Sequence, residues 1–174
     1  RDMAIKFGAA LDLARPLADT PDVHPLELAG RRTQEDLVLM VPRPGRHHLD
    51  AAVLCFPSHW RLADKLGGSA LAIHDPVPRY GDDLAERVDR FLERLRPDVI
   101  GARRNWSVHD TPELFAPDPP TRPRPAEPLE VGSRFWLRSE RQTLRRLPRR
   151  GAVLFMDGDG QHPAAELARL VAAA

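Results

Sequence analysis

Proline is the residue type that most restricts how this chain can fold. There are 18 prolines among 174 residues, and they cluster in the connections between apolar runs. Because proline fixes φ and lacks an amide hydrogen, it ends helices and favours turns. The sequence therefore predicts short elements that are joined by connections of fixed geometry.

The apolar runs predict two strands first and three strands later. The pattern favours strands over residues 36–42, 48–56, 103–108, 133–147 and 152–156. Pro44 and Gly45 are a turn signal between the first two strands, which are therefore expected to form a hairpin.

Helical patterns lie around and between these strands. A short helix or turn is predicted over residues 24–30, with Pro25 in its first turn. A second helix should begin after Pro57, with Ser58 as its cap, and end at Gly67. The clearest helix covers residues 83–95, where Asp83 and Glu86 have the spacing of a capping box. Its apolar stripe consists of Leu84, Val88, Phe91, Leu92 and Leu95.

This order of elements predicts an α+β fold. Runs of one element type favour an antiparallel sheet with helices packed on one face. A hairpin, a helical cluster and three further strands is also the order of a PAS domain, which is an analogy of fold alone. We expect a weakly defined extension over residues 1–35, the domain itself over 36–156, and a C-terminal segment over 157–174. This last segment should contain a turn at Gly158 and Gly160 and a short helix over 163–173. Residues 117–128 read as an exposed, stiff loop.

Charge and cysteine content exclude several classes. The net charge of +1 gives no basis for binding nucleic acid or a membrane. The single cysteine, Cys55, permits no internal disulfide and favours a cytoplasmic location. Because the first residue is Arg1 rather than Met, an upstream segment is expected to be missing.

His74 is the residue that most invites a chemical role. It follows an apolar run and precedes Pro76 and Pro78, so it should have little conformational freedom. Such rigidity suits a metal ligand. A buried histidine that is hydrogen-bonded to the backbone is the alternative. His109 is the rival ligand candidate, although Asp110 and the Thr-Pro that follows it indicate a strand end.

The strand over residues 133–147 is unusually polar. Alternation places one set of side chains on one face, namely Trp136, Arg138, Glu140 and Gln142. A carboxylate ligand could supply a counter-charge for its arginines. A solvated edge strand with cross-strand ion pairs is the equally weighted alternative. In the preceding strand Asn105 and Trp106 should point to opposite faces, so that one of them lines a pocket.

Several stretches together resemble one known family. They are CFPSHWRLADKLG (55–67), IHDPVPRY (73–80), RRNWSVHD (103–110), SERQTLRRLP (139–148) and AVLF (152–155). In this order they are similar to the haem-dependent oxidative N-demethylase α-subunit-like family. The resemblance implies a PAS-fold domain that binds haem b. It also implies oxidation by O₂ of an N-methyl group on a small secondary amine such as dimethylamine, with electrons from NADPH delivered by separate flavin and iron–sulfur subunits.

On this resemblance we assign provisional roles to individual residues. His74 is expected to be the axial iron ligand, with the helix over residues 83–95 as a wall of the cofactor site. The haem propionates are expected to bind Arg138, Arg141 and Arg145. Asn105 and Trp106 are expected to be further cofactor-binding residues. Glu140 and Gln142 are expected to orient a substrate ammonium. A non-catalytic PAS-like sensor and a haem-free relative are the alternatives.

Overall fold

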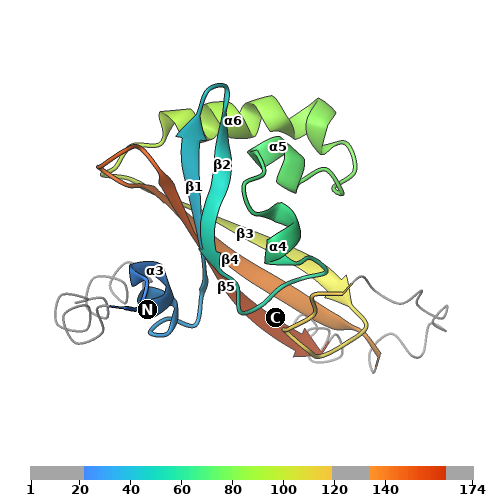
Figure 1. The fold of residues 1–174 in the computed structure, drawn as a ribbon. Helices are drawn as coiled ribbons and strands as arrows, with labels where there is room; N and C mark the ends of the chain where they lie inside the picture. The colour runs from blue at the N-terminus through green and yellow to red at the C-terminus, as the bar shows by residue number, and fades with distance from the viewer. Residues whose placement is uncertain (1–21, 119–133, 164–174) are drawn as a thin grey trace.

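The computed structural model describes residues 22–118 and 134–163, which form an α+β domain around one antiparallel sheet (Figure 1). Its five strands are β1 (Asp36–Arg43), β2 (Arg46–Val53), β3 (Ile100–His109), β4 (Trp136–Arg146) and β5 (Val153–Pro163). Their order across the sheet is β2-β1-β5-β4-β3. The predicted strands, their number and their antiparallel pairing are thus confirmed.

The first hairpin contains a shift in register that the alternation of its sequence does not reveal. Gly45 closes the turn with φ +85°, a conformation that glycine adopts without strain. The pairing of β1 with β2 then shifts between Leu39 and Met40, because Leu39 pairs with Ala51 whereas Met40 pairs with Leu49. Asp50 is the extra residue, so the side chains of β2 change face at this point.

The two faces of the sheet carry different helices. We call front the face that bears Met40, Leu49, Leu144 and Val153, which pack with Leu92 of α6 in the main core. The opposite, back face carries a smaller cluster, in which Leu37, Met156 and Ala29 are buried. The prediction that helices cover one face is therefore wrong, since α3 (Pro25–Gly30) packs on the back.

The front helices are shorter than the sequence suggests. They are α4 (Leu62–Lys65), α5 (Ala70–Ile73), the π-helical turn η1 (Tyr80–Leu84) and α6 (Ala85–Arg94). Ser58 does not cap a helix: it forms a bridge with Ala116, and His59 after it has a positive φ of 59°. These two features delay α4 until Leu62.

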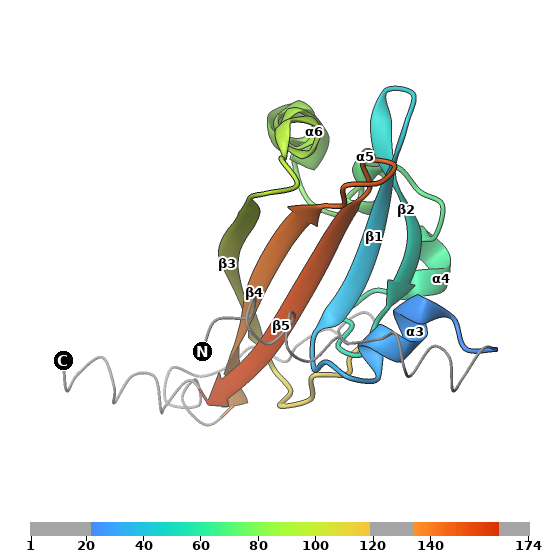
Figure 2. The ribbon, with the colours of Figure 1, turned by 90° about the vertical axis from the view of Figure 1, so that its left-hand side faces the viewer.

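The predicted capping box at the start of the long helix is also wrong. Asp83 lies inside η1 and pairs with Arg79 at 2.9 Å, while Leu84 is the residue that precedes α6 and makes no side-chain cap. The stripe of α6 is only partly buried: Leu92 and Leu95 lie in the core, whereas Phe91 is half exposed. Figure 2 shows α6 end-on at one end of the sheet.

The last strand extends well beyond its predicted end. Gly158 and Gly160 lie inside β5, where they pair with Arg141 and Ser139 of β4. The tight turn expected there is therefore wrong. The predicted helix near the C-terminus, most of the N-terminal extension and most of the proline-rich loop fall outside the described residues.

Candidate functional site

His74 ends the short helix α5 and has one ring nitrogen already committed. Ser69 caps this helix by accepting a hydrogen bond from the amide of Ala72 at 3.2 Å. The His74 ring then turns back, with Nδ1 2.7 Å from the carbonyl oxygen of Ala70. A carbonyl oxygen only accepts, so Nδ1 carries the hydrogen and Nε2 has the lone pair. Among the described residues, no side chain or backbone group bonds to Nε2.

Burial keeps the His74 imidazole neutral. Its pKa is lowered from the ordinary value mainly by desolvation; the Ala70 hydrogen bond opposes this, and the charges of Lys65 and Arg103 add to it. Tyr80 covers one face of the ring, with the two centroids 4.3 Å apart and the planes 9° from parallel. A neutral ring whose second nitrogen is held by a backbone carbonyl is the usual arrangement of a metal-binding histidine.

Five side chains on the front face of β3, β4 and β5 form what we call the polar floor: Arg103, Asn105, Glu140, Gln142 and Asp157. Gln142 lies at its centre: its amide nitrogen donates to Asp157 at 2.7 Å and to Glu140 at 3.4 Å, while its oxygen accepts from Arg103. Asn105 donates to the same Glu140 oxygen at 3.1 Å. The predicted placement of Glu140 and Gln142 on one face of the strand is therefore confirmed. The structure also joins the two side chains in one hydrogen-bond network.

Asp157, like Arg103, is a member of the polar floor that the sequence did not reveal as a candidate. Desolvation raises its pKa to about 7, and the charges of Glu140, Asp159 and Asp36 contribute, whereas the Gln142 hydrogen bond opposes the shift. Its Oδ1 atom is buried and has no hydrogen-bond partner among the described residues. The sequence carried a signal for this placement. If the strand of residues 152–156 continues by one residue, Asp157 lies on the same face as Val153 and Phe155.

Arg138 was expected to bind a propionate, but its guanidinium is committed inside the protein. The side chain is 1% exposed. It donates to Asp159 at 2.8 Å, to the carbonyl of Leu114 at 3.1 Å and to the carbonyl of Phe56. Asp36 accepts from the amide of Phe56 at 3.1 Å, so this segment is tied to the sheet from both sides. Arg138 therefore holds the loop that borders the polar floor.

The other two predicted arginines lie on the wrong face for the same site. Arg141 and Arg145 alternate with Gln142 and Leu144, which places them on the back of the sheet. Arg145 donates to the carbonyl of Pro97 at 3.2 Å. Arg103, which the sequence analysis did not select, is the arginine on the front face whose charge reaches His74.

Asn105 and Trp106 point to opposite faces, as predicted. Asn105 pairs in register with Glu140 and shares its face, whereas Trp106 lies on the back. Trp106 is 68% exposed. Of the two, only Asn105 therefore belongs to the polar floor.

His109, the rival ligand, is buried in a different setting. Its Nε2 is 2.9 Å from the hydroxyl of Ser107, and its ring stacks on His59 with centroids 5.3 Å apart. Desolvation and the charges of Arg138 and His59 lower its pKa. His109 therefore has its Nε2 engaged, while its Nδ1 is buried and has no hydrogen-bond partner among the described residues.

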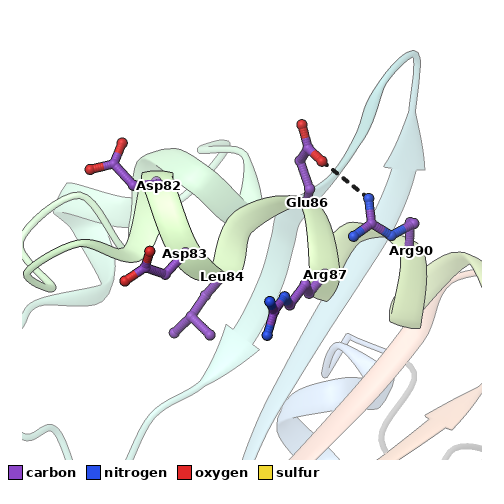
Figure 3. Close-up of a pocket in the computed structure, with 7 residues that line it drawn as sticks. Asp82, Asp83, Leu84, Glu86, Arg87 and Arg90 are labelled. Carbon is purple, nitrogen blue, oxygen red and sulfur yellow. Dashed lines mark hydrogen bonds and ion pairs between the residues drawn. The ribbon is translucent and has the colours of Figure 1, made fainter.

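A surface groove also runs along the outer side of η1 and α6. It is lined by Gly81, Asp82, Asp83, Leu84, Glu86, Arg87 and Arg90, and Figure 3 shows the labelled side chains fanning away from the helix. Glu86 and Arg90 pair across one turn at 3.1 Å. Since all its lining residues come from one helical segment, the groove is a feature of that helix and involves neither His74 nor the polar floor.

Within residues 22–118 and 134–163, no cluster of three or more His, Cys, Asp or Glu side chains could hold a metal ion. Within the same residues, every helix is too short or too polar to span a bilayer.

The comparison with known protein families gives one match that covers almost the whole chain. A family model described as haem-dependent oxidative N-demethylase, alpha subunit-like, matches residues 6–169. The match includes α5 with His74 and all five strands. The resemblance drawn from the five sequence motifs is thereby confirmed, and the chain belongs to the haem-dependent oxidative N-demethylase α-subunit-like family.

Proposed function

We propose that this chain is the haem-binding subunit of an O₂-using oxidative N-demethylase, or a related monooxygenase, that acts on a small alkylamine. The family match supports the cofactor and the reaction class. The observation that carries the proposal is the His74 ring, which is neutral and bonded to Ala70 through Nδ1, and whose Nε2 has no partner among the described residues. Nε2 is the atom that we assign to the iron.

His74 and Arg103 suit haem b, whereas the three arginines expected from the sequence do not. We therefore assign a different arginine to the propionates. When bound, haem supplies the O₂ chemistry. Arg103 lies on the same face as the polar floor and its charge reaches His74, so it is our candidate for a propionate partner. Arg138, Arg141 and Arg145 do not suit this role, because the first is fully committed and the others lie on the back.

The polar floor suits a substrate ammonium. A cationic amine in a partly desolvated site needs a carboxylate or another acceptor. Glu140 supplies a carboxylate, and Asp157, whose pKa is raised to about 7, supplies a second carboxyl group that ionises near neutral pH. Gln142 donates to both, which fixes their positions. We assign substrate orientation to Glu140 and Gln142, and we add Asp157 because its Oδ1 is an acceptor without a partner among the described residues.

The electrons must come from other proteins. The only cysteine, Cys55, cannot hold an iron–sulfur cluster alone, and an α-subunit-like family name fits an assembly of several subunits. We propose delivery from NADPH through flavin and iron–sulfur partner subunits, in the cytoplasm. We also propose that the domain is PAS-like and spans residues 36–156, since the order of hairpin, helices and three strands is the one expected.

An absorption spectrum tests the cofactor and its ligand. The protein reconstituted with haem should show a Soret band of a histidine-ligated haem, and His74→Ala should abolish that ligation. His109→Ala is the matched control, because it removes a second buried histidine and should leave the spectrum unchanged. Loss of the histidine-ligated spectrum in His109→Ala alone would move the ligand to His109. The lack of any Soret band would reject haem binding.

A turnover assay separates catalysis from the second candidate function, a haem-binding sensor without chemistry. The sensor is favoured by one observation: Arg103 and Asn105 are exposed, so the polar floor is open to water in the described part of the chain. Dimethylamine and related amines, supplied with a surrogate reductant, should yield formaldehyde if the protein is an N-demethylase. Haem binding without formaldehyde from any of these amines would support the sensor.

A further inference from the structure

Tyr80 lies flat against the ring of His74 and begins the π-helical turn. The two rings are 4.3 Å apart and 9° from parallel, and Tyr80 is 5% exposed. Arg79, directly before it, has a left-handed φ of 61°. Such a conformation is strained for a non-glycine residue, and it lies at the point where the chain enters the turn that begins with Tyr80.

The hydroxyl of Tyr80 lies in a polar interior beneath α6. It is buried and has no hydrogen-bond partner among the described residues, and the same is true of Oδ1 of Asp89. Asp89 pairs with Arg46 of β2 at 2.9 Å through its other oxygen. The pKa of Tyr80 is raised by desolvation and next by the charge of Asp89. Buried polar groups of this kind normally bond to ordered water.

We propose that Tyr80 is a positioning residue: its ring fixes the plane of the His74 imidazole, and its hydroxyl is anchored through buried water to Asp89. The hydrogen bond from Nδ1 to Ala70 fixes one edge of the imidazole but leaves it free to rotate about that edge. A parallel ring on one face removes this freedom, so Nε2 keeps one direction. The inference rests on the proposed function in one respect: the role of the stacked pair depends on His74 as the iron ligand. The stacking itself is a feature of the haem-free protein and does not depend on that assignment.

Nuclear magnetic resonance of the haem-free protein tests the stacking directly. Tyr80 is the only tyrosine in the chain, so any Overhauser effect from tyrosine ring protons comes from Tyr80. The chain has seven histidines, and the signals lost in His74→Ala identify His74. The wild type should show this effect to His74, upfield ring-current shifts of the His74 protons, and one tautomer with hydrogen on Nδ1. Tyr80→Leu, which keeps an apolar side chain, should lose the ring-current shifts and broaden the His74 signals. Tyr80→Phe should retain them.

The two variants also keep the test valid if folding is impaired. Both remove the hydroxyl, so a defect caused only by its loss would appear equally in Tyr80→Phe and Tyr80→Leu. If both variants are folded and His74 gives the same single, shifted set of signals in each, ring stacking does not position His74 and the inference is overturned. If only Tyr80→Leu unfolds, the Overhauser effect between Tyr80 and His74 in the wild type decides the question. Absence of that effect overturns the inference.

The haem-loaded protein gives a second readout. An aromatic pair of this kind contributes about 0.5–1.5 kcal/mol, so exogenous imidazole should displace His74 from ferric haem at a roughly two- to tenfold lower concentration in Tyr80→Leu. Tyr80→Phe should match the wild type. If haem does not bind at all, the proposed function fails, but the His74–Tyr80 coupling is still decided in the haem-free protein.

A crystal structure tests the anchor. Ordered water should lie within hydrogen-bond distance of both the Tyr80 hydroxyl and Oδ1 of Asp89. A hydroxyl that instead bonds directly to a protein group, or a dry interior at this place, would overturn this half of the inference.

Discussion

The front face of the sheet is apolar at one end and charged at the other, although the same strands run through both. At the end crossed by α6, Leu144 of β4 and Val153 of β5 are buried against Leu92. A few residues along the same strands, Arg138 and Asp159 are equally buried, with 1% and 2% of their side chains exposed. Equal burial with opposite chemistry means that apolar packing stabilises one end of the face and ion pairs and hydrogen bonds stabilise the other.

The two ends differ in how they respond to loss of a side chain. An apolar core loses contacts and transfer free energy when a side chain is shortened. A buried charge network behaves differently, because removal of one member leaves its partner charged and unpaired. The predictions below use this difference, and they are ordered by the size of the expected effect.

The largest effect should follow Arg138→Met. This change removes three hydrogen bonds and leaves Asp159 buried without its cation. Loss of one partner of a buried ion pair costs about 3–5 kcal/mol, and chemical denaturation measures it as a lower free energy of unfolding. The destabilisation should diminish in acid, where Asp159 is protonated. Arg145→Met is the matched control: the same change on the same strand removes one exposed bond to Pro97 and should cost less than about 1 kcal/mol. Equal losses in both variants would contradict the role of Arg138.

The next effect concerns the apolar end. Leu92→Ala should lower the free energy of unfolding by about 2–5 kcal/mol, because Leu92 is 1% exposed and its shortening leaves a cavity. In contrast to Arg138→Met, the loss should be the same at acid and neutral pH. Leu84→Ala, at an exposed position just before the same helix, should change stability by no more than about 0.5 kcal/mol. A clear pH dependence of the Leu92 effect would show that the two ends are coupled.

The sheet was predictable because its strands alternate and because proline and glycine mark their ends. The helical segment was less predictable. Asp83 has the sequence of an N-cap, yet it pairs with Arg79, since the π-turn at Tyr80 begins the helical path earlier. The turn predicted at Gly158 failed for a similar reason: pairing with Arg141 of β4 overrides the local preference of glycine and aspartate for turns.

The sequence indicated which residues to consider for the candidate site, but not which groups those residues contact. His74 was identified from the rigidity of its surroundings, and Glu140 with Gln142 from the polarity of their strand. The role of Arg138 was not predictable, because its partners at Phe56, Leu114 and Asp159 are distant in sequence and meet only in the fold. Asp157 was missed because its elevated pKa depends on burial between β4 and β1.

Asp157→Asn should stabilise the protein at neutral and alkaline pH. The folded-state pKa is raised from 3.8 to about 7. Between these values the folded state holds a proton that the unfolded chain has lost, so stability falls as the pH rises through this window. Each pKa unit corresponds to about 1.4 kcal/mol; with allowance for partial exposure, the free energy of unfolding at about pH 8 should rise by about 1–3 kcal/mol. Below about pH 4 the variant and the wild type should agree. Asp50→Asn, on the exposed edge strand, should show no such pH-dependent gain.

The smallest effects separate the two faces of β3. Trp106→Ser alters an exposed side chain on the back and should change stability by no more than about 0.5 kcal/mol. Asn105→Ala, one residue away on the front, removes the bond to Glu140 and should cost about 0.5–1.5 kcal/mol. It should also weaken amine binding to the haem-loaded protein, as measured by spectral titration, because Glu140 loses a donor that fixes it. If Trp106→Ser weakened amine binding as much as Asn105→Ala, the site could not be confined to the front face. Asn105 and Trp106 are neighbours in β3 and point to opposite faces of the sheet. The pair of variants therefore tests whether amine binding depends on the front face alone.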